Sequence, residues 1–384
     1  MSLSVRESIR SYQRDSYLGG APLQLNPDCI PIDCLRGYSP WGVSPLAVQA
    51  YRNFDIQTVS RYGEMFYASS LKPAIIKRFG LDRNLEGQLF LGHGSFNLME
   101  RLIHKLIAPG LMLGVGPQFN EVPSEYIASS GRYVPIPIAA PENAYPFKRL
   151  ADEIASGSYS VLYLDNPNNP LGYHLPLGCV SVLARMAERH GTIVIVDEAY
   201  GDFVDDMESA IHLVRQHENL AVVRSFSKCL GLAAERVGYM FLSASLAKLY
   251  VQLDVPFEPS IIAATLATTT LSDCSFIEFI RREALFAKMT IINALGDVGY
   301  DILPTHPGVS IFCVHKGGVN VVEEMASIGV SVEPGSAFHK ANALWDDTYC
   351  RIRVTSLEET AELCRRLCSL TADKRGYGYH VDER

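Results

Sequence analysis

Four short segments of the chain contain side chains that could take part in chemistry: LDNPNNPLG (164–172), VIVDEAYGDF (194–203), SFSKCLGLAAERVGY (225–239) and CRIRVTS (350–356). Lys228 in the third segment has a primary amine, which can form a Schiff base with an aldehyde. Taken one at a time, such segments have ordinary explanations: a surface lysine at a helix start, an aspartate that caps a helix, or an asparagine in a turn. Any one of these segments is therefore weak evidence of a site.

The third segment also holds groups that suit a phosphate. Arg236 follows Lys228 by eight residues, and Ser225 and Ser227 flank the lysine with hydroxyls. A guanidinium and hydroxyls bind a dianion through charge-assisted hydrogen bonds. A helix start would add backbone amides and a favourable dipole, although GHGSF can also be an ordinary helix cap. The residues expected at that helix start are Gly94, Ser95 and Phe96.

Short apolar runs between about residues 86 and 245 predict the strands that position these segments. They are rich in Val, Ile and Leu, which is typical of strands buried on both faces. The runs are QLFLG, LMLGVG, YVPIPI, SVLYLD, TIVIVDEAY, LAVVRSFS and VGYMFLS. Amphipathic stretches separate them, such as residues 97–110, which we expect to form one helix. This alternation predicts an α/β fold with a mainly parallel, doubly wound sheet.

The remaining sequence predicts a smaller α+β unit. Residues 258–296 have a continuous helical pattern that would lead out of the large domain. Strands are expected at VSIFCVHK, VSVEPG and RIRVTS, with helices at roughly 318–328 and 357–371. We therefore expect an N-terminal segment (1–45) that joins the small domain, a large domain (46–270) and a C-terminal small domain (271–384).

Composition excludes several classes of protein. The chain has 384 residues, 48% of them hydrophobic, and a net charge of −8, which argues against a nucleic-acid binder because phosphates require clustered Lys and Arg. No apolar run reaches transmembrane length and no leader is visible, so we expect a cytoplasmic protein without a membrane partner. Nine scattered cysteines without a CxxC pair favour reduced thiols over a disulfide framework or a metal site.

The four segments together resemble the pyridoxal 5′-phosphate (PLP) dependent aminotransferases of fold type I, most closely the histidinol-phosphate aminotransferase-like branch. The resemblance spans roughly residues 30–370. It implies that Lys228 holds the cofactor as a Schiff base and moves the substrate proton. It also implies that Arg236 binds the cofactor phosphate, together with the serines and the helix start named above.

The resemblance assigns further positions around the cofactor ring. Asp197, at the end of an apolar strand, would face the pyridine nitrogen, and a carboxylate there keeps that nitrogen protonated. Tyr200 and Asn169 would bind the ring hydroxyl oxygen. Phe119 would stack on the ring, with core packing as the alternative. Tyr67 would reach the phosphate of a neighbouring subunit, so that a homodimer shares its active sites.

Two further positions concern the substrate. Arg351 corresponds to the family arginine that binds a substrate carboxylate, with Arg353 two residues later as the competing candidate. Glu333 stands where histidinol-phosphate enzymes have an arginine, and a carboxylate there would repel a phosphorylated substrate. The alternative is an exposed glutamate beside a turn.

The resulting hypothesis is an aminotransferase that moves an amino group between an amino acid and a 2-oxo acid by a ping-pong mechanism. The same fold and lysine also serve decarboxylases and β-lyases, and the sequence does not show which Cα bond is broken. A carboxylate-binding Arg351 favours transamination. A non-catalytic regulatory protein is a third alternative, although such proteins typically lose the lysine or the aspartate that are both present here.

Overall fold

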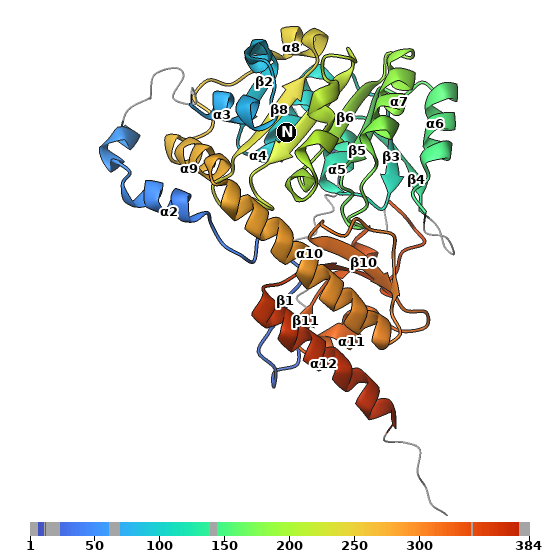
Figure 1. Cartoon of the computed structure of the whole chain (residues 1–384). Helices are drawn as coiled ribbons and strands as arrows, with labels where there is room; N and C mark the ends of the chain where they lie inside the picture. The colour runs from blue at the N-terminus through green and yellow to red at the C-terminus, as the bar shows by residue number, and fades with distance from the viewer. Residues whose placement is uncertain are drawn as a thin grey trace, which may run out of the picture.

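The computed structural model describes residues 7–10, 12, 24–60, 70–138, 144–338 and 341–375. Its central element is a seven-stranded sheet of order β2-β8-β7-β6-β5-β3-β4 (Figure 1). The strands are β2 (Leu89–Gly92), β3 (Leu111–Gly116), β4 (Arg132–Pro137), β5 (Val161–Asp165), β6 (Ile193–Asp197), β7 (Leu220–Ser225) and β8 (Gly238–Leu242). Strands β3 to β7 pair in parallel, whereas β8 is antiparallel to both of its neighbours. The seven expected apolar runs are therefore the seven strands.

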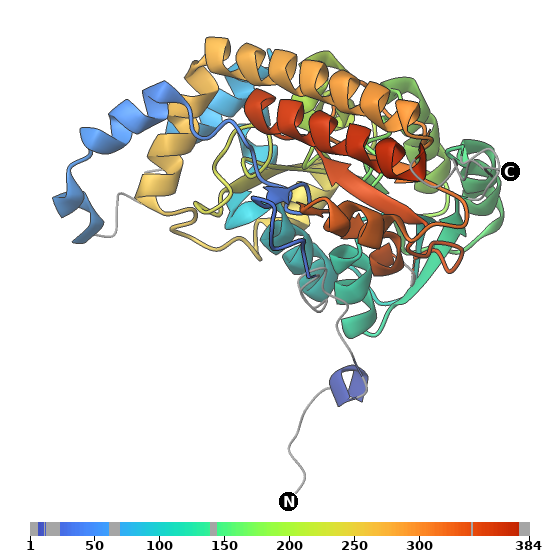
Figure 2. The ribbon, with the colours of Figure 1, turned by 90° about the horizontal axis from the view of Figure 1, so that it is seen from below.

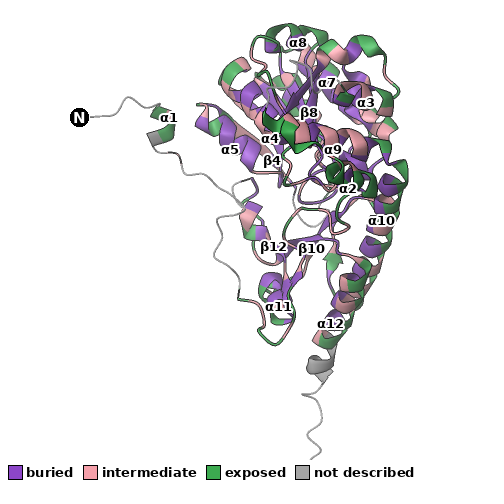
Figure 3. Cartoon of the chain, turned by 90° about the vertical axis from the view of Figure 1, so that its left-hand side faces the viewer, coloured by how far each residue is buried: buried purple, intermediate pink, exposed green. Residues whose placement is uncertain are grey.

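Helices cover both faces of this sheet because successive side chains of each buried strand point to opposite sides. In β6, Val194 and Val196 belong to one hydrophobic cluster and Ile195 to another. The first cluster includes side chains of α3 (Leu71–Arg78), α6 (Phe147–Ser156), α7 (Leu177–Glu188) and α9 (Ile261–Ser272). The second includes α4 (Gly94–Arg101), α5 (Glu121–Ala128) and α8 (Ala244–Tyr250). Figure 3 shows the buried strands between helices whose outer surfaces are exposed.

Two expected helices are interrupted in the structure. The helix expected at 97–110 is the end of α4 followed by a π-helical turn, Leu102–Leu106. The prediction of one continuous helix at 258–296 is wrong, because the helix is interrupted at Asp273, between the end of α9 and the start of α10 (Cys274–Asp297). The Asp273 carboxylate accepts a hydrogen bond from the Phe276 amide at 3.2 Å, so it caps α10 and fixes the break.

A smaller unit follows α10. Its four-stranded antiparallel sheet has the order β12-β13-β10-β9. The strands are β9 (Asp301–Ile302), β10 (Ile311–His315), β12 (Glu333–Pro334) and β13 (Tyr349–Arg353). Helix α12 (Leu357–Arg375) lies along α10, as Figure 2 shows, and α11 (Val321–Ser327) packs nearby. The run VSVEPG, expected as one strand, contributes both β11 (Val330–Ser331) and β12.

The N-terminal part of the chain contacts both units. Strand β1 (Ile32–Asp33) pairs in parallel with β11 of the small unit. Helix α2 (Pro45–Arg52) then packs against α9 and leads to a 3-10 helix, Ile56–Ser60, that stands away from the large unit (Figure 1). The short α1 (Glu7–Arg10) is placed near α5 by a hydrogen bond from Ser8 to the Ala128 carbonyl. The domain boundaries expected from the sequence stay a prediction.

Across the described ranges, every helix is too short or too polar to cross a membrane. All nine cysteines lie within those ranges, and each is a free thiol.

Candidate active site

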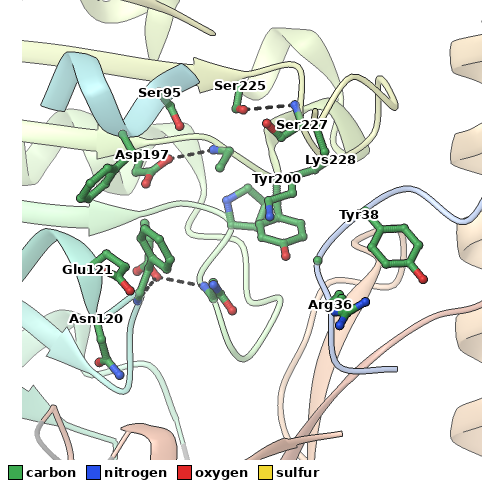
Figure 4. Close-up of a pocket in the computed structure, with 18 of the residues that line it drawn as sticks. Arg36, Tyr38, Ser95, Asn120, Glu121, Asp197, Tyr200, Ser225, Ser227 and Lys228 are labelled. Atoms are coloured by element: carbon green, nitrogen blue, oxygen red, sulfur yellow. Dashed lines mark hydrogen bonds between the residues drawn. The ribbon is translucent and has the colours of Figure 1, made fainter. Parts of the chain in front are cut away.

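Strands β5, β6 and β7 end side by side at the edge of the sheet that faces the small unit. Asp165 ends β5 and pairs in register with Asp197, which ends β6, while Ser225 ends β7. Ligands of parallel α/β sheets bind at this carboxyl edge. A cavity of about 660 Å³ opens there (Figure 4). The predicted site residues that line it are Ser95, Phe96, Phe119, Asn169, Asp197, Tyr200, Ser225, Ser227, Lys228, Arg236, Glu333 and Arg351.

Lys228 and Tyr200 lie next to one another in the cavity (Figure 4). The Lys228 Nζ is 5.4 Å from the centroid of the Tyr200 ring. The Tyr200 hydroxyl is buried and has no hydrogen-bond partner among the described residues. Gly37 approaches both groups, and a Cβ at this position would lie 2.8 Å from Nζ and 2.8 Å from the hydroxyl. The backbone of the N-terminal segment therefore lies close against the lysine, and a larger residue at position 37 would displace the Lys228 amine or the Tyr200 hydroxyl.

Asp197 is a buried carboxylate held from two sides. Its Oδ1 accepts a hydrogen bond from the Ala199 amide at 3.0 Å, and its Oδ2 accepts one from the Tyr163 hydroxyl at 3.2 Å. Burial raises the pKa of Asp197 to about 6, against hydrogen bonds and the Lys228 charge that lower it. A cationic ring nitrogen would stabilise this buried carboxylate.

The groups that the sequence predicts to bind a phosphate gather at the start of α4. Arg236 Nη1 donates to the Ser227 hydroxyl at 3.3 Å and to the Ala233 carbonyl at 2.9 Å. Gly94 begins α4 with a positive φ of 83°, and a Cβ there would lie 2.7 Å from Arg236 Nη2. The Ser227 amide donates to the Ser225 hydroxyl at 3.1 Å. Guanidinium, hydroxyl and helix amides thus converge at one end of the cavity, which suits a dianion.

Asp165 holds two of the predicted residues in place. Its Oδ2 accepts hydrogen bonds from the backbone amides of Phe119 at 3.1 Å and Asn169 at 2.9 Å. Burial raises the pKa of Asp165 to about 8, against these hydrogen bonds, which lower it. The Phe119 ring meets the Phe96 ring edge-on at 6.5 Å. Asp165 was not among the predicted residues, although it ends an apolar strand just as Asp197 does.

The two candidate arginines of β13 have different surroundings. Arg351 lines the cavity, where its Nη1 donates to Asn169 Oδ1 at 2.8 Å and its Nη2 donates to Glu333 Oε2 at 3.1 Å. Arg353 instead donates to the Val354 and Asp33 backbone carbonyls, away from the cavity lining. Glu333 is buried in the cavity wall rather than exposed beside a turn.

Buried ion pairs hold the strand ends beneath the cavity. Arg224, which precedes Ser225, donates at 2.7 Å to both Glu198 and Asp202. Arg78 forms a second ion pair with Asp202 at 2.8 Å. Because these side chains are almost fully buried, loss of one partner would leave an uncompensated charge. The network therefore fixes the ends of β6 and β7, from which Asp197 and Lys228 project.

Some cavity residues carry no recognisable sequence signal. Arg36, Gly37 and Tyr38 reach the cavity from a segment about 190 residues before Lys228, and Asn120, Glu121 and Phe338 also line it. Their placement depends on packing between the two units. The predicted Tyr67 lies outside the described residues.

Comparison with known proteins identifies the family. The family model "aminotransferase class I and II" matches residues 39–367. A histidinol-phosphate aminotransferase of Natronomonas pharaonis is 30% identical over 82% of this chain and 86% of its own length, and one of Halorubrum lacusprofundi is 28% identical over 91% of each. The chain belongs to the aminotransferase class I and II family.

Solved structures give the fold. Histidinol-phosphate aminotransferase of Sinorhizobium meliloti, determined in complex with pyridoxal-5′-phosphate, superposes with a TM-score of 0.77 at 20% identity, covering 96% of this chain and 99% of that one. Aspartate aminotransferase of Thermus thermophilus, with maleate, superposes at 0.76 and 17% identity, covering 96% and 100%. The fold is that of the fold type I PLP-dependent aminotransferases.

The residues at the cavity fit PLP on their own chemistry. An amine, a buried carboxylate, an unpartnered buried tyrosine hydroxyl and a phosphate-binding cluster surround one space. The cluster would bind the phosphate, Asp197 the ring nitrogen and Lys228 the aldehyde carbon. A ring oxygen would satisfy the Tyr200 hydroxyl, whose burial without a partner costs about 1–3 kcal/mol.

Proposed function

We propose that the chain uses PLP to move an amino group between an amino acid and a 2-oxo acid in two half-reactions. The observation that supports this proposal is the single cavity that contains Lys228, Asp197 and Arg236 together with Arg351. The first three residues suit the cofactor. Arg351 suits a substrate carboxylate, because a planar guanidinium matches a planar anion.

The residues have separate tasks in such a reaction. PLP, when bound, supplies an aldehyde that bonds covalently to amines and a ring that accepts electrons from the substrate Cα. Lys228 Nζ takes the proton from Cα and returns a proton later, which requires a base within reach of that carbon. Asp197 keeps a proton on the ring nitrogen, and Tyr200 donates its hydroxyl hydrogen inside the cavity. The Gly37 backbone lies against Lys228 Nζ and limits the space around the amine.

Arg351 favours amino transfer over decarboxylation. A carboxylate that the guanidinium holds is kept from leaving, so the proton on Cα is the group that Lys228 removes. The test is to mix the purified holoenzyme with amino acids and measure 2-oxo acid by mass spectrometry and CO₂ by a coupled assay. We expect 2-oxo acid in amounts equal to the cofactor present when no acceptor is added. Stoichiometric CO₂ without 2-oxo acid would refute the proposal.

We also propose that two copies form a homodimer that shares its active sites. Support comes from residues 45–60, in which the 3-10 helix Ile56–Ser60 stands away from the large unit (Figure 1) and several apolar side chains are exposed. Tyr51 is 61% exposed and Ile56 is 63% exposed. Apolar side chains gathered on one projecting segment are typical of an interaction surface.

A further inference from the structure

Glu333 is a buried carboxylate placed directly beside the carboxylate-binding arginine. The two residues face one another in register on β12 and β13, and Arg351 Nη2 lies 3.1 Å from Glu333 Oε2. The Glu333 side chain is 2% exposed and the Arg351 side chain 6%. Both line the cavity. Glu333 therefore belongs to the wall that a substrate contacts.

Three of the five N–H donors of Arg351 already have acceptors, while Nε is buried without a partner among the described residues. Nη2 uses both of its hydrogens, one toward Glu333 and one toward the Leu35 carbonyl, and Nη1 donates to Asn169 Oδ1. The charge of the guanidinium is matched by Glu333 before any substrate arrives. A substrate carboxylate at Arg351 would thus bring two carboxylates to one cation. An additional cation is needed to balance this part of the cavity.

Glu333 has an oxygen that could accept from such a cation. Its Oε1 makes no hydrogen bond to any residue in the described ranges, whereas Oε2 is bound by Arg351. Burial raises the pKa of Glu333 while Arg351 lowers it, so a second cation would further favour the ionised form. A phosphate group on the substrate would be repelled by this carboxylate, because both are anions.

On the basis of the proposed function, we propose that the amino donor is a basic amino acid, whose terminal guanidinium or ammonium binds Glu333 while its α-carboxylate binds Arg351. Charges then alternate: Glu333 lies between two cations, and Arg351 lies between two carboxylates. Glu333 is the residue that selects the side chain. Neutral donors lack the required cation, and phosphorylated or acidic donors place a further anion against Glu333.

The first test compares donors of nearly equal shape that differ in charge. The half-reaction of the holoenzyme is followed by its visible spectrum with arginine against citrulline, and with lysine against norleucine. A charge-assisted hydrogen bond is worth about 1.5–3 kcal/mol, which corresponds to a factor of about 10 to 150. We expect the second-order rate constant of the half-reaction to be higher by this factor for the charged member of at least one pair. Equal rates within both pairs, or faster reaction with histidinol phosphate, would overturn the proposal.

Variants locate the effect at Glu333. Glu333→Gln should bring the charged and neutral members of the pair to within about threefold of one another. Glu323→Gln, at an exposed position of α11, is the matched control and should keep the wild-type preference. A preference that survives in Glu333→Gln would assign the selection to another residue and refute this one.

A binding measurement separates this proposal from the proposed function. The probes are 5-guanidinopentanoate, which is arginine without its α-amino group, and its uncharged counterpart 5-ureidopentanoate. Neither can donate an amino group. Calorimetry with the holoenzyme should give a Kd about 10- to 150-fold lower for the guanidinium compound, with the difference lost in Glu333→Gln. Equal affinities would refute the role of Glu333, whereas failure of every donor to react would refute the amino transfer alone.

Discussion

Replacing Gly94 by alanine would place a methyl group where the start of α4 meets Arg236. The Cβ would lie 2.7 Å from Nη2 and 3.3 Å from Cζ of Arg236, closer than carbon atoms normally approach. Gly94 also has a positive φ of 83°, which alanine adopts only with strain. Because Arg236 ends in a flexible side chain, we expect the guanidinium to move out of the phosphate site while the fold is retained.

Two costs add in this variant. The left-handed backbone conformation costs about 1–2 kcal/mol of folding stability. If Arg236 binds the cofactor phosphate as proposed, its displacement removes a charge-assisted hydrogen bond worth about 1.5–3 kcal/mol. The dissociation constant of PLP should therefore rise about 10- to 150-fold.

The chain offers a matched control at Gly80. Gly80 has a φ of 60°, and a Cβ there would meet nothing within 4 Å, so Gly80→Ala has the backbone strain without the obstruction. Absorbance titration with PLP gives the dissociation constant, and urea unfolding of the cofactor-free protein gives stability. Both variants should lose stability, but only Gly94→Ala should lose cofactor affinity. Equal affinity in Gly94→Ala and wild type, or equal loss in both variants, would refute the assignment of the phosphate site.

Three further predictions follow from other parts of the structure. Asp197→Asn should slow the half-reaction roughly 100- to 1000-fold, and a loss below tenfold in single-turnover kinetics would mean that another group serves the ring nitrogen. Burial acts to raise the pKa of Asp206, but Arg78 and two further arginines lower it to about 2. The ionised Asp206 carboxylate therefore contributes about 2 kcal/mol to the free energy of unfolding above pH 5, and this contribution is lost as the pH falls from about 4 toward 2. By urea unfolding, Asp206→Asn should be less stable than wild type by that amount at pH 6 and by less in acid. Tyr67→Phe and Lys228→Ala should complement one another in mixed dimers, and a monomer by light scattering would contradict the shared site.

The sequence predicted the sheet better than it predicted the helix ends. The strands of the large sheet are short apolar runs, and burial on both faces produces such a run in the inner strands, whereas the edge strand β4 is only half-buried. Asp273 shows the limit, because its neighbours continue the helical pattern and only the local geometry makes its side chain a cap. The π-helical turn after Arg101 likewise has no periodicity signal.

Some residues of the candidate site could be predicted from the sequence and others could not. Lys228, Asp197 and Arg236 were predicted because their segments resemble those of PLP-dependent aminotransferases. Asp165 could have been found because it ends an apolar strand, as Asp197 does. Gly37 could not, since its position over Lys228 depends on how the N-terminal segment crosses between the units. For Glu333, the sequence did not decide between an exposed turn position and a position in the cavity wall. Only the pairing of β12 with β13 places Glu333 beside Arg351.

Chemical labelling can identify the lysine that bonds to the cofactor. The holoenzyme is reduced with borohydride, which fixes the cofactor to its lysine, then digested and mapped by mass spectrometry. We predict that the added mass is found on the peptide that contains Lys228, and that Lys228→Ala protein treated in parallel acquires no tag while keeping its fold by circular dichroism. A tag on a different lysine in the wild-type protein would contradict the account.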